Sequence, residues 1–476
     1  MTKKLNGTET GAQILAVDIG TTSVRAFVFD AEGTILGKAQ VAYPTKRPKP
    51  YFEEQDPDLV KASTFAAIRS LFESGQAKPE SIRGISFSSQ MYSLIALDEA
   101  GMPLTNSILW SDGRAERQAL RLKEAFGPLG LYRFTGCPMN SIYPIAKIAW
   151  LREEEPLVFR HAARFVSIKE YVAKDIIGRW AVDYSMASAS GLFDVAAHRW
   201  HGPALEAVGI AEANLSTPVS GTCTFTLIDN SPLADLGLSK VLPIFLGAGD
   251  GPLANLGSGA VEVGAINIDL GTSGAARCTT GAAVVDETAS LWCFCLDETR
   301  WAYGGIVTNV GNAYQWLASS VAEVSGMSPE AAFEFLNAKA KAIEPGSKGL
   351  LFMPYLRKAV AYDLKTIIEL MDRRGPTLAH IVLTGGLSRS LVVPDILADV
   401  LGREIRIPSQ NEGSIAGAAI LGFMGLGMEA WFGDGNAGAS VYPDRGRSAI
   451  YAEHYRNYTA LVERLRGFGA PGRENP

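Results

Sequence analysis

The stretch Asp18-Ile19-Gly20-Thr21-Thr22 follows the apolar run Ile14–Val17 and precedes a second apolar-rich run, Val24–Phe29. The pattern returns later in the chain, where Asp269-Leu270-Gly271-Thr272-Ser273 follows the run Gly264–Ile268. Each copy predicts a strand, a tight turn with glycine and hydroxyl groups, and a second strand. Glycine lets the backbone approach a ligand closely, and successive N–H groups in such a turn can bind an anion. Two such hairpins predict two related domains that close on one polyphosphate, as in ATP chemistry within a cleft.

The composition is that of an ordinary globular protein with more than one domain. The chain has 476 residues, of which 47% are hydrophobic and 20% charged, and this length exceeds a single core. The net charge of −6 argues against a nucleic-acid partner or a membrane surface. No apolar run is long enough to cross a bilayer, and the polar start at Met1–Gln13 lacks the apolar segment of a secretory signal. We therefore expect a cytoplasmic protein.

The cysteines predict neither a disulfide framework nor a metal site. There are 5 of them, an odd number, and they are scattered along the chain. Cys293 and Cys295 would share one face of a strand, but no second Cys or His pair completes a metal site. A buried pair on a strand is the favoured interpretation.

Strand-like and helix-like segments alternate, which predicts α/β domains. Asp56-Pro57 is typical of a helix start, and Gly178 of a helix end after Ile168–Ile177. The segment 243–264 runs from a strand into glycines and small residues, and is the candidate hinge. We expect an N-terminal domain over residues 1–250, with the first phosphate motif and the sugar side. A C-terminal domain over residues 251–476 would provide the nucleotide side.

Three carboxylates are candidates for chemistry. Asp18 ends a strand beside an anion-binding turn and could hold Mg²⁺, although an aspartate there can also simply cap the turn. Asp269, in the second copy, could support the phosphates indirectly. Asp250 lies between Gly249 and Gly251 at the candidate hinge, where phosphoryl transfer to an alcohol needs a base. The alternative for Asp250 is an ordinary Asp-Gly turn.

Two further clusters suit ligand binding. Gly385-Gly386, between a strand and a helix, would allow a nucleotide to approach the backbone, or merely allow close packing. The segments Ser88–Tyr92 and Trp110–Arg114 combine aromatic, amide, carboxylate and guanidinium groups, which suit the C–H faces and hydroxyls of a polyol. A surface loop with one anchored tryptophan is the alternative interpretation of that second cluster.

Together these segments resemble the FGGY family of carbohydrate kinases. The matching stretches run in family order from Leu15–Asp30 to Ser414–Gly422 and cover most of the chain. The resemblance implies two ribonuclease H-like, actin-like domains with ATP and a sugar in the cleft between them. It also implies a homodimer.

The resemblance assigns roles to individual residues. Asp18 would be associated with Mg²⁺, and Asp250 would be the catalytic base and would also contact the acceptor. The implied nucleotide-binding residues are Gly20, Thr21, Thr22, Gly271, Thr272, Gly311, Gln315, Gly385, Gly386 and Ser390. The remaining implied acceptor-binding residues are Gln90, Met91, Tyr92, Trp110, Asp112 and Arg114.

The branch within the family is less sharply defined. Ser88–Asp98, Ser167–Tyr171 and Asp183–Asp194 are similar to segments of gluconokinases. Gln90-Met91, in contrast, resembles the Gln-Met-His of xylulokinases, although Tyr92 stands where histidine is usual in both branches. The segment Leu109–Arg114 is also closer to xylulokinases. The predicted reaction is ATP-dependent phosphorylation of a primary hydroxyl, gluconate giving 6-phosphogluconate, with a xylulose or ribulose kinase as the alternative.

One departure opens a different class of function. After Met353–Leu356 the family has a Gly-Glu-Arg-Ala-Pro stretch, whereas here Arg357–Tyr362 leads directly to a helix expected at Leu364–Met371. Either the C-terminal domain is shortened near residues 356–361, which would suit a catalytically impaired sugar- or nucleotide-binding relative, or the sequence omits a segment of the protein there. An actin-like structural protein would share the hairpins but would not need the Ser88–Tyr92 and Trp110–Arg114 segments.

Overall fold

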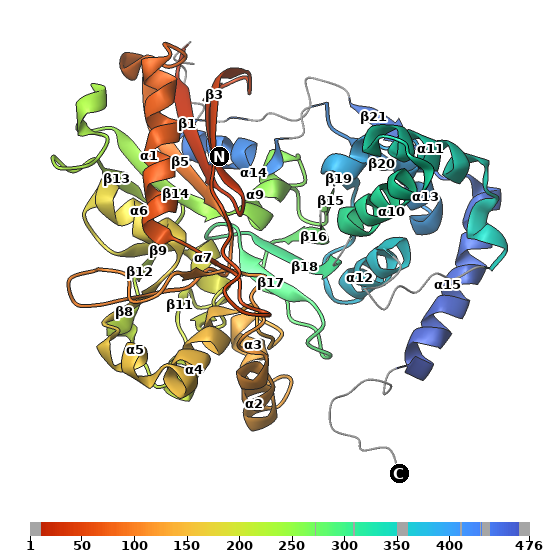
Figure 1. Cartoon of the computed structure of the whole chain (residues 1–476), viewed down its shortest axis with the longest axis horizontal. Coiled ribbons are helices and arrows are strands. Elements are labelled where there is room, and N and C mark those ends of the chain that lie inside the picture. Colours follow the sequence, from red (N-terminus) through yellow and green to blue (C-terminus); the bar gives the residue numbers. More distant parts are fainter. Residues whose placement is uncertain are drawn as a thin grey trace, which may run out of the picture.

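The computed structural model describes residues 11–271, 273–307, 310–349, 360–409, 412–428, 430 and 438–465. In these residues two large sheets dominate, and Figure 1 shows them on either side of helices α9 (Asp250–Gly257) and α14 (Gly413–Gly425). Among the described helices, none combines the length and apolarity needed to span a bilayer.

The first sheet comes from the N-terminal half of the chain. Its strand order is β13 (Thr224–Thr226), β14 (Pro243–Gly249), β5 (Ile82–Ser89), β1 (Gln13–Ile19), β2 (Ser23–Asp30) and β3 (Ile35–Ala42). β1 pairs antiparallel with β2 and parallel with β5, so β1 is central and buried on both faces.

The second sheet repeats this plan. Its order is β17 (Trp292–Cys295), β18 (Trp301–Val307), β16 (Gly274–Thr280), β15 (Ile266–Leu270), β19 (Ile381–Thr384), β20 (Ile405–Ile407) and β21 (Ala439–Val441). β15 pairs antiparallel with β16 and parallel with β19, just as β1 pairs with β2 and β5. These registers confirm the predicted α/β class and the predicted hairpin in each half.

Helices cover both faces of the first sheet. Because side chains alternate along β1, Leu15 and Val17 pack with α1 (Pro57–Glu73) and α6 (Ile168–Ile177), while Ile14 and Ala16 pack with α14. α1 begins where Asp56 accepts hydrogen bonds from the N–H groups of Asp58 and Leu59, as the sequence predicted. α6 ends at a left-handed Gly178, also as predicted.

The remaining elements complete the two halves. Helices α2 (Glu116–Phe126), α3 (Tyr132–Thr135), α4 (Pro144–Glu154), α5 (Pro156–His161), α7 (Tyr184–Ser188) and α8 (Gly202–Val208) belong to the N-terminal half. The C-terminal half contains α10 (Val310–Ser325), α11 (Pro329–Ala342), α12 (Val360–Arg374), α13 (Val393–Leu401) and α15 (Arg445–Leu465). The short strands β4 (Glu54–Gln55), β6 (Ile95–Leu97), β7 (Ser107–Ile108), β8 (Arg164–Val166), β9 (Ala181–Asp183), β10 (Phe193–Asp194), β11 (Arg199–Trp200) and β12 (Thr217–Val219) form two-stranded sheets.

α14 comes from the C-terminal half but packs on the first sheet. A methyl group added at Gly422 would lie 2.9 Å from Ile14 Cγ2, and one added at Gly425 would lie 2.4 Å from Phe245 Cε1. The small residues of α14 therefore permit close contact with β1 and β14. The boundary at residues 250–251 stays a prediction, and residues 356–359 lie outside the described residues.

Candidate functional site

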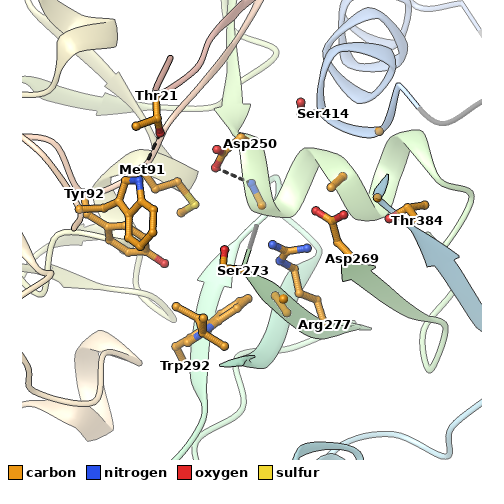
Figure 2. A pocket seen from close by; sticks show the side chains of 18 of the residues that line it. Thr21, Met91, Tyr92, Asp250, Asp269, Ser273, Arg277, Trp292, Thr384 and Ser414 are labelled. Atoms are coloured by element: carbon orange, nitrogen blue, oxygen red, sulfur yellow. Dashed lines mark hydrogen bonds between the residues drawn. The ribbon is translucent and has the colours of Figure 1, made fainter. Parts of the chain in front are cut away.

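A cavity of about 370 Å³ lies between the two sheets, at the turn ends of both predicted hairpins. Its lining combines residues of the first half (Thr21, Arg25, Met91, Tyr92, Trp110), of α9 (Asp250, Gly251, Ala254), of the second sheet and the glycine turn after it (Asp269, Ser273, Gly274, Ala275, Arg277, Trp292, Ile306, Thr384, Gly385) and of α14 (Gly413, Ser414). Figure 2 shows these side chains converging on one space from several elements.

Asp18 lies at the first hairpin and is held by a network that spans the chain. Its Oδ2 accepts hydrogen bonds from Nε and Nη2 of Arg25, at 3.2 and 2.6 Å, and from Oγ of Ser414, at 3.3 Å. Arg25 also donates from Nη1 to Oε2 of Glu412, at 3.0 Å. Asp18 and Arg25 face each other across the β1–β2 ladder, so the hairpin register produces this pair.

The other oxygen of Asp18 suits a cation. Asp18 is 4% exposed, and its Oδ1 is buried without a hydrogen-bond partner in the described residues. In that same part of the chain, no group of three or more His, Cys, Asp or Glu side chains could enclose a metal ion. A divalent cation here would bind one carboxylate, phosphate oxygens and water, which is an ordinary environment for Mg²⁺.

Asp250 is the first residue of α9 and lines the cavity directly after the buried strand β14. Its Oδ1 accepts a hydrogen bond from the N–H of Gly251 at 2.7 Å. The pKa of Asp250 is raised to about 7, first because the carboxyl is withdrawn from water and second because the Asp18 carboxylate disfavours another negative charge. A carboxylate that titrates near neutral pH suits a general base.

Buried polar groups fix the strand that leads to Asp250. Nζ of Lys169 donates to the carbonyls of Leu246 and Ala248, at 3.0 and 2.9 Å, and forms an ion pair with Asp183 at 2.6 Å. The end of β14 is therefore anchored on its α6 side. Sequence reasoning placed Lys169 in the gluconokinase-like segment Ser167–Tyr171 but gave it no role, because the lysine acts through carbonyls that are distant in the chain.

The second hairpin joins other predicted nucleotide-binding residues. The N–H of Gly271 donates to the carbonyl of Ser273 at 2.9 Å, and the N–H of Gly311 donates to the carbonyl of Gly271 at 3.0 Å. Gly385 has a φ of +85°, and a Cβ there would lie 2.5 Å from the carbonyl oxygen of Leu270. Only glycine fits this approach of the β19 turn to the hairpin. Thr272 lies outside the described residues.

Met91, Tyr92 and Trp110 line the opposite side of the cavity. Nε1 of Trp110 donates to Oγ1 of Thr21 at 3.2 Å, which joins the predicted acceptor segment to the first hairpin. Nζ of the buried Lys147, on α4, donates to the carbonyls of Tyr92 and Leu109, at 2.7 and 2.8 Å. Lys147 therefore joins the two predicted acceptor segments.

Other predicted residues are not among those lining this cavity. Asp112 and Arg114 form an ion pair at 2.7 Å, and Arg114 also pairs with Glu54 at 2.6 Å and stacks on Phe52. Their charges stabilise one another next to the site. The further residues outside the lining are Gly20, Thr22, Gln90, Gly271, Gly311, Gln315, Gly386 and Ser390, as well as Asp18 behind Arg25.

The structure adds residues for which sequence reasoning gave no role. Arg25 and Ser414 hold Asp18, and Arg277 and Trp292 line the cavity from the second sheet. Arg25 could have been identified from the hairpin register, since it stands opposite Asp18. Arg277 shares a strand face with Ala275, and that alternation is the only sequence signal for it.

Comparison with known proteins gives a consistent family assignment. The model of the N-terminal domain of the FGGY family of carbohydrate kinases matches residues 13–257, and that of the C-terminal domain matches residues 357–426. A gluconokinase of Bacillus licheniformis is 34% identical over 87% of this chain and 88% of its own length. The crystal structure of a gluconate kinase from Lactobacillus acidophilus superposes with a TM-score of 0.88 at 25% identity, covering 95% of this chain and 98% of the other. A ligand-bound xylulose kinase from the same organism gives 0.88 at 26% identity, covering 96% and 99%.

Proposed function

Because the chain belongs to the FGGY family of carbohydrate kinases, and so is a phosphotransferase with an alcohol acceptor, we propose that it phosphorylates gluconate at the expense of ATP. The observation that carries this proposal is the position of Asp250, which lines one cavity together with residues of both hairpins. Gluconate is favoured over a ketopentose because the gluconokinase relative is 34% identical. A xylulose or ribulose acceptor is the second candidate, supported by the similarity to a xylulose kinase structure.

The proposed reaction is an in-line phosphoryl transfer. Asp250 takes the proton of the primary hydroxyl while the hydroxyl oxygen forms a bond to the γ-phosphorus of ATP. The bond between that phosphorus and the β–γ bridging oxygen breaks, and ADP leaves with the electron pair. Closure of the two halves around the cavity would exclude water and limit hydrolysis of ATP.

Groups of both hairpins would hold the phosphates. The first turn would offer the N–H and hydroxyl groups of Thr21 and Thr22, the second hairpin would offer the hydroxyl of Ser273, and the turn at Gly385–Gly386 lies beside the second hairpin. Asp18 would hold Mg²⁺ through its unpartnered Oδ1. When bound, this cation would neutralise part of the phosphate charge. The proposal includes a homodimer and a cytoplasmic location, where ATP and sugar acids are available.

The substitution Asp250→Asn tests the proposed base. Phosphotransfer should fall by about 10²- to 10⁴-fold, the usual contribution of a positioned base, while ATP binding measured by calorimetry stays unchanged. Thermal unfolding at pH 8 provides the control. Because the pKa of Asp250 is raised in the folded protein, ionisation of this carboxyl lowers the stability of the fold as pH rises from the ordinary aspartate range through about 7. The asparagine side chain does not ionise, so Asp250→Asn should raise the melting temperature at pH 8. Unchanged turnover in this variant would remove Asp250 from its role.

The acceptor is identified by ADP release against gluconate, xylulose, ribulose, glycerol and erythritol. Release with gluconate at the highest kcat/KM supports the proposal, and preference for a pentulose replaces it with the second candidate. ADP release with none of them would support the catalytically impaired relative considered above.

A further inference from the structure

Two arginines reach the cavity, and their partners differ. Arg25 is neutralised by Asp18 at 2.6 Å and by Glu412 at 3.0 Å. Nη1 of Arg277 donates instead to the neutral Oδ1 of Asn267 at 3.3 Å, and within the described residues no carboxylate lies within ion-pair distance of Arg277. Nε of Arg277 is buried without a hydrogen-bond partner in that part of the chain. A buried cationic donor without a partner is costly, so this group points to a ligand.

The neighbours of Arg277 fix its orientation. Nδ2 of Asn267 donates to Oγ1 of Thr384 at 3.0 Å, which leaves Oδ1 of Asn267 for Arg277. Nδ2 of Asn255 donates to the backbone carbonyl of Arg277 at 3.2 Å. Because Nη1 is engaged by Asn267, the edge formed by Nε and Nη2 is the one left for a ligand.

That free edge faces the start of α9. A methyl group added at Gly251 would lie 3.3 Å from Nε and 3.6 Å from Nη2 of Arg277, and 3.5 Å from Sδ of Met91, so this edge lies against the start of α9 and beside a residue of the predicted acceptor segment. In Figure 2 the guanidinium of Arg277 points from β16 toward Asp250 and the first turn of α9. The two parallel N–H groups on this edge match the two oxygens of a carboxylate.

The position of Arg277 along β16 separates it from the phosphate turn. At about 3.3 Å per residue, Arg277 lies ~10 Å along the strand from Gly274, where the hairpin turn ends. It pairs with Gly304, which in turn pairs with Trp292. Trp292 lines the cavity and stacks on Phe294 at 4.5 Å, and Phe294 contacts Tyr92 at 5.9 Å. Arg277 therefore belongs to the aromatic, acceptor side of the cavity.

We propose that Arg277 binds the carboxylate of a sugar-acid acceptor through Nε and Nη2, and so selects an aldonate over a neutral sugar. This inference rests on the proposed function, because it assumes that the hydroxyl at the other end of the acceptor meets Asp250. It assigns Arg277 to substrate specificity and not to proton transfer.

The test compares Arg277→Met and Arg277→Lys with the unaltered protein. The acceptors are gluconate and glucitol, which has a CH₂OH group in place of the carboxylate. Arg277 lowers the pKa of Asp250, so its loss would raise that pKa, and the assays are run at pH 8.5 to keep the base ionised. Arg406→Met is the matched control, since Arg406 is exposed on β20 of the same sheet.

Arg277→Met should raise KM for gluconate by about 10- to 100-fold, the range of a charge-assisted hydrogen-bond pair, with kcat changed by less than about 3-fold. KM for glucitol should stay unchanged. Arg277→Lys, which keeps the positive charge but lacks the two parallel N–H groups, should give an intermediate KM for gluconate. Arg406→Met should behave like the unaltered protein. A fall in kcat with both acceptors at unchanged KM would instead assign Arg277 to the phosphoryl group and overturn the inference.

Failure of the inference can be separated from failure of the proposed function. If the unaltered protein phosphorylates neutral acceptors and shows no preference for gluconate, the kinase assignment stands and the role of Arg277 is wrong. If no acceptor is phosphorylated, gluconate binding in the presence of ADP is measured by calorimetry. Binding that Arg277→Met abolishes and Arg406→Met preserves would support the inference, and absence of binding to the unaltered protein would overturn it.

Discussion

The two hairpins share one backbone design but distribute charge differently. Asp18 stands opposite Arg25 in the β1–β2 ladder, whereas Asp269 stands opposite Ala275 in the β15–β16 ladder. The first carboxylate therefore accepts hydrogen bonds from a cross-strand arginine, and its Oδ1 has no hydrogen-bond partner among the described residues. In the second hairpin Ala275 has no charged group to pair with Asp269, and the arginine stands further along β16, at Arg277. Repetition of the fold thus preserves the Asp-x-Gly-Thr turn while the neighbouring side chains differ.

The comparison predicts unequal effects of removing the two carboxylates. Asp18→Asn should lower kcat by about 100-fold or more and raise the Mg²⁺ concentration needed for half-maximal rate, because one charge for the cation is lost. Asp269→Asn should lower kcat by about 10-fold, the lower end of the range for a group that supports ligands indirectly. Steady-state rates over a Mg²⁺ titration measure both. Equal losses in the two variants would mean that the hairpins are not specialised in this way.

The same comparison predicts a graded effect of pH. Because the pKa of Asp250 is about 7, kcat/KM of the unaltered protein should fall about tenfold per pH unit below 7, as the base takes up a proton. Asp18 raises this pKa more than Asp269 does, so the acidic limb should move to lower pH in Asp18→Asn, and less in Asp269→Asn. Profiles of residual kcat/KM against pH for both variants show which acidic limb moves further. A limb that moves further in Asp269→Asn would contradict it.

Glycine substitutions should have the smallest effects and should also differ between the hairpins. Gly385→Ala places a Cβ 2.5 Å from the Leu270 carbonyl oxygen at a φ of +85°, and should cost about 1–3 kcal/mol of unfolding free energy. Gly20→Ala places a Cβ 3.0 Å from the Ser23 carbonyl oxygen without a positive φ, and should cost about 1 kcal/mol or less. Urea unfolding of both variants measures the difference. A larger loss at Gly20 would show that the first hairpin is the more tightly constrained.

The local elements of this fold could be predicted from the sequence because their signals are local. The hairpins follow from apolar runs around Gly-Thr turns, α1 from Asp56-Pro57, and the end of α6 from Gly178. The convergence of Asp250 and the two hairpins on one cavity could be anticipated because the glycine-rich motif appears twice.

Long-range pairing accounts for what could not be predicted. The acceptor-binding role of Asp112 and Arg114 stays a prediction, but the ion pair of Arg114 with Glu54, a residue distant in the sequence, could not be foreseen. Arg277 has an undistinguished local sequence, and its importance depends on having Asn267 rather than a carboxylate as its partner. Such partners are set by tertiary packing and not by spacing along the chain.

The most direct test of the central claim is a crystal structure with a non-hydrolysable ATP analogue, Mg²⁺ and gluconate. We expect the β- and γ-phosphates between Gly20–Thr22 and Gly271–Ser273, Mg²⁺ beside Oδ1 of Asp18, and the acceptor hydroxyl at Asp250. A nucleotide bound elsewhere, or touching only one hairpin with Asp250 remote from its terminal phosphate, would contradict the account.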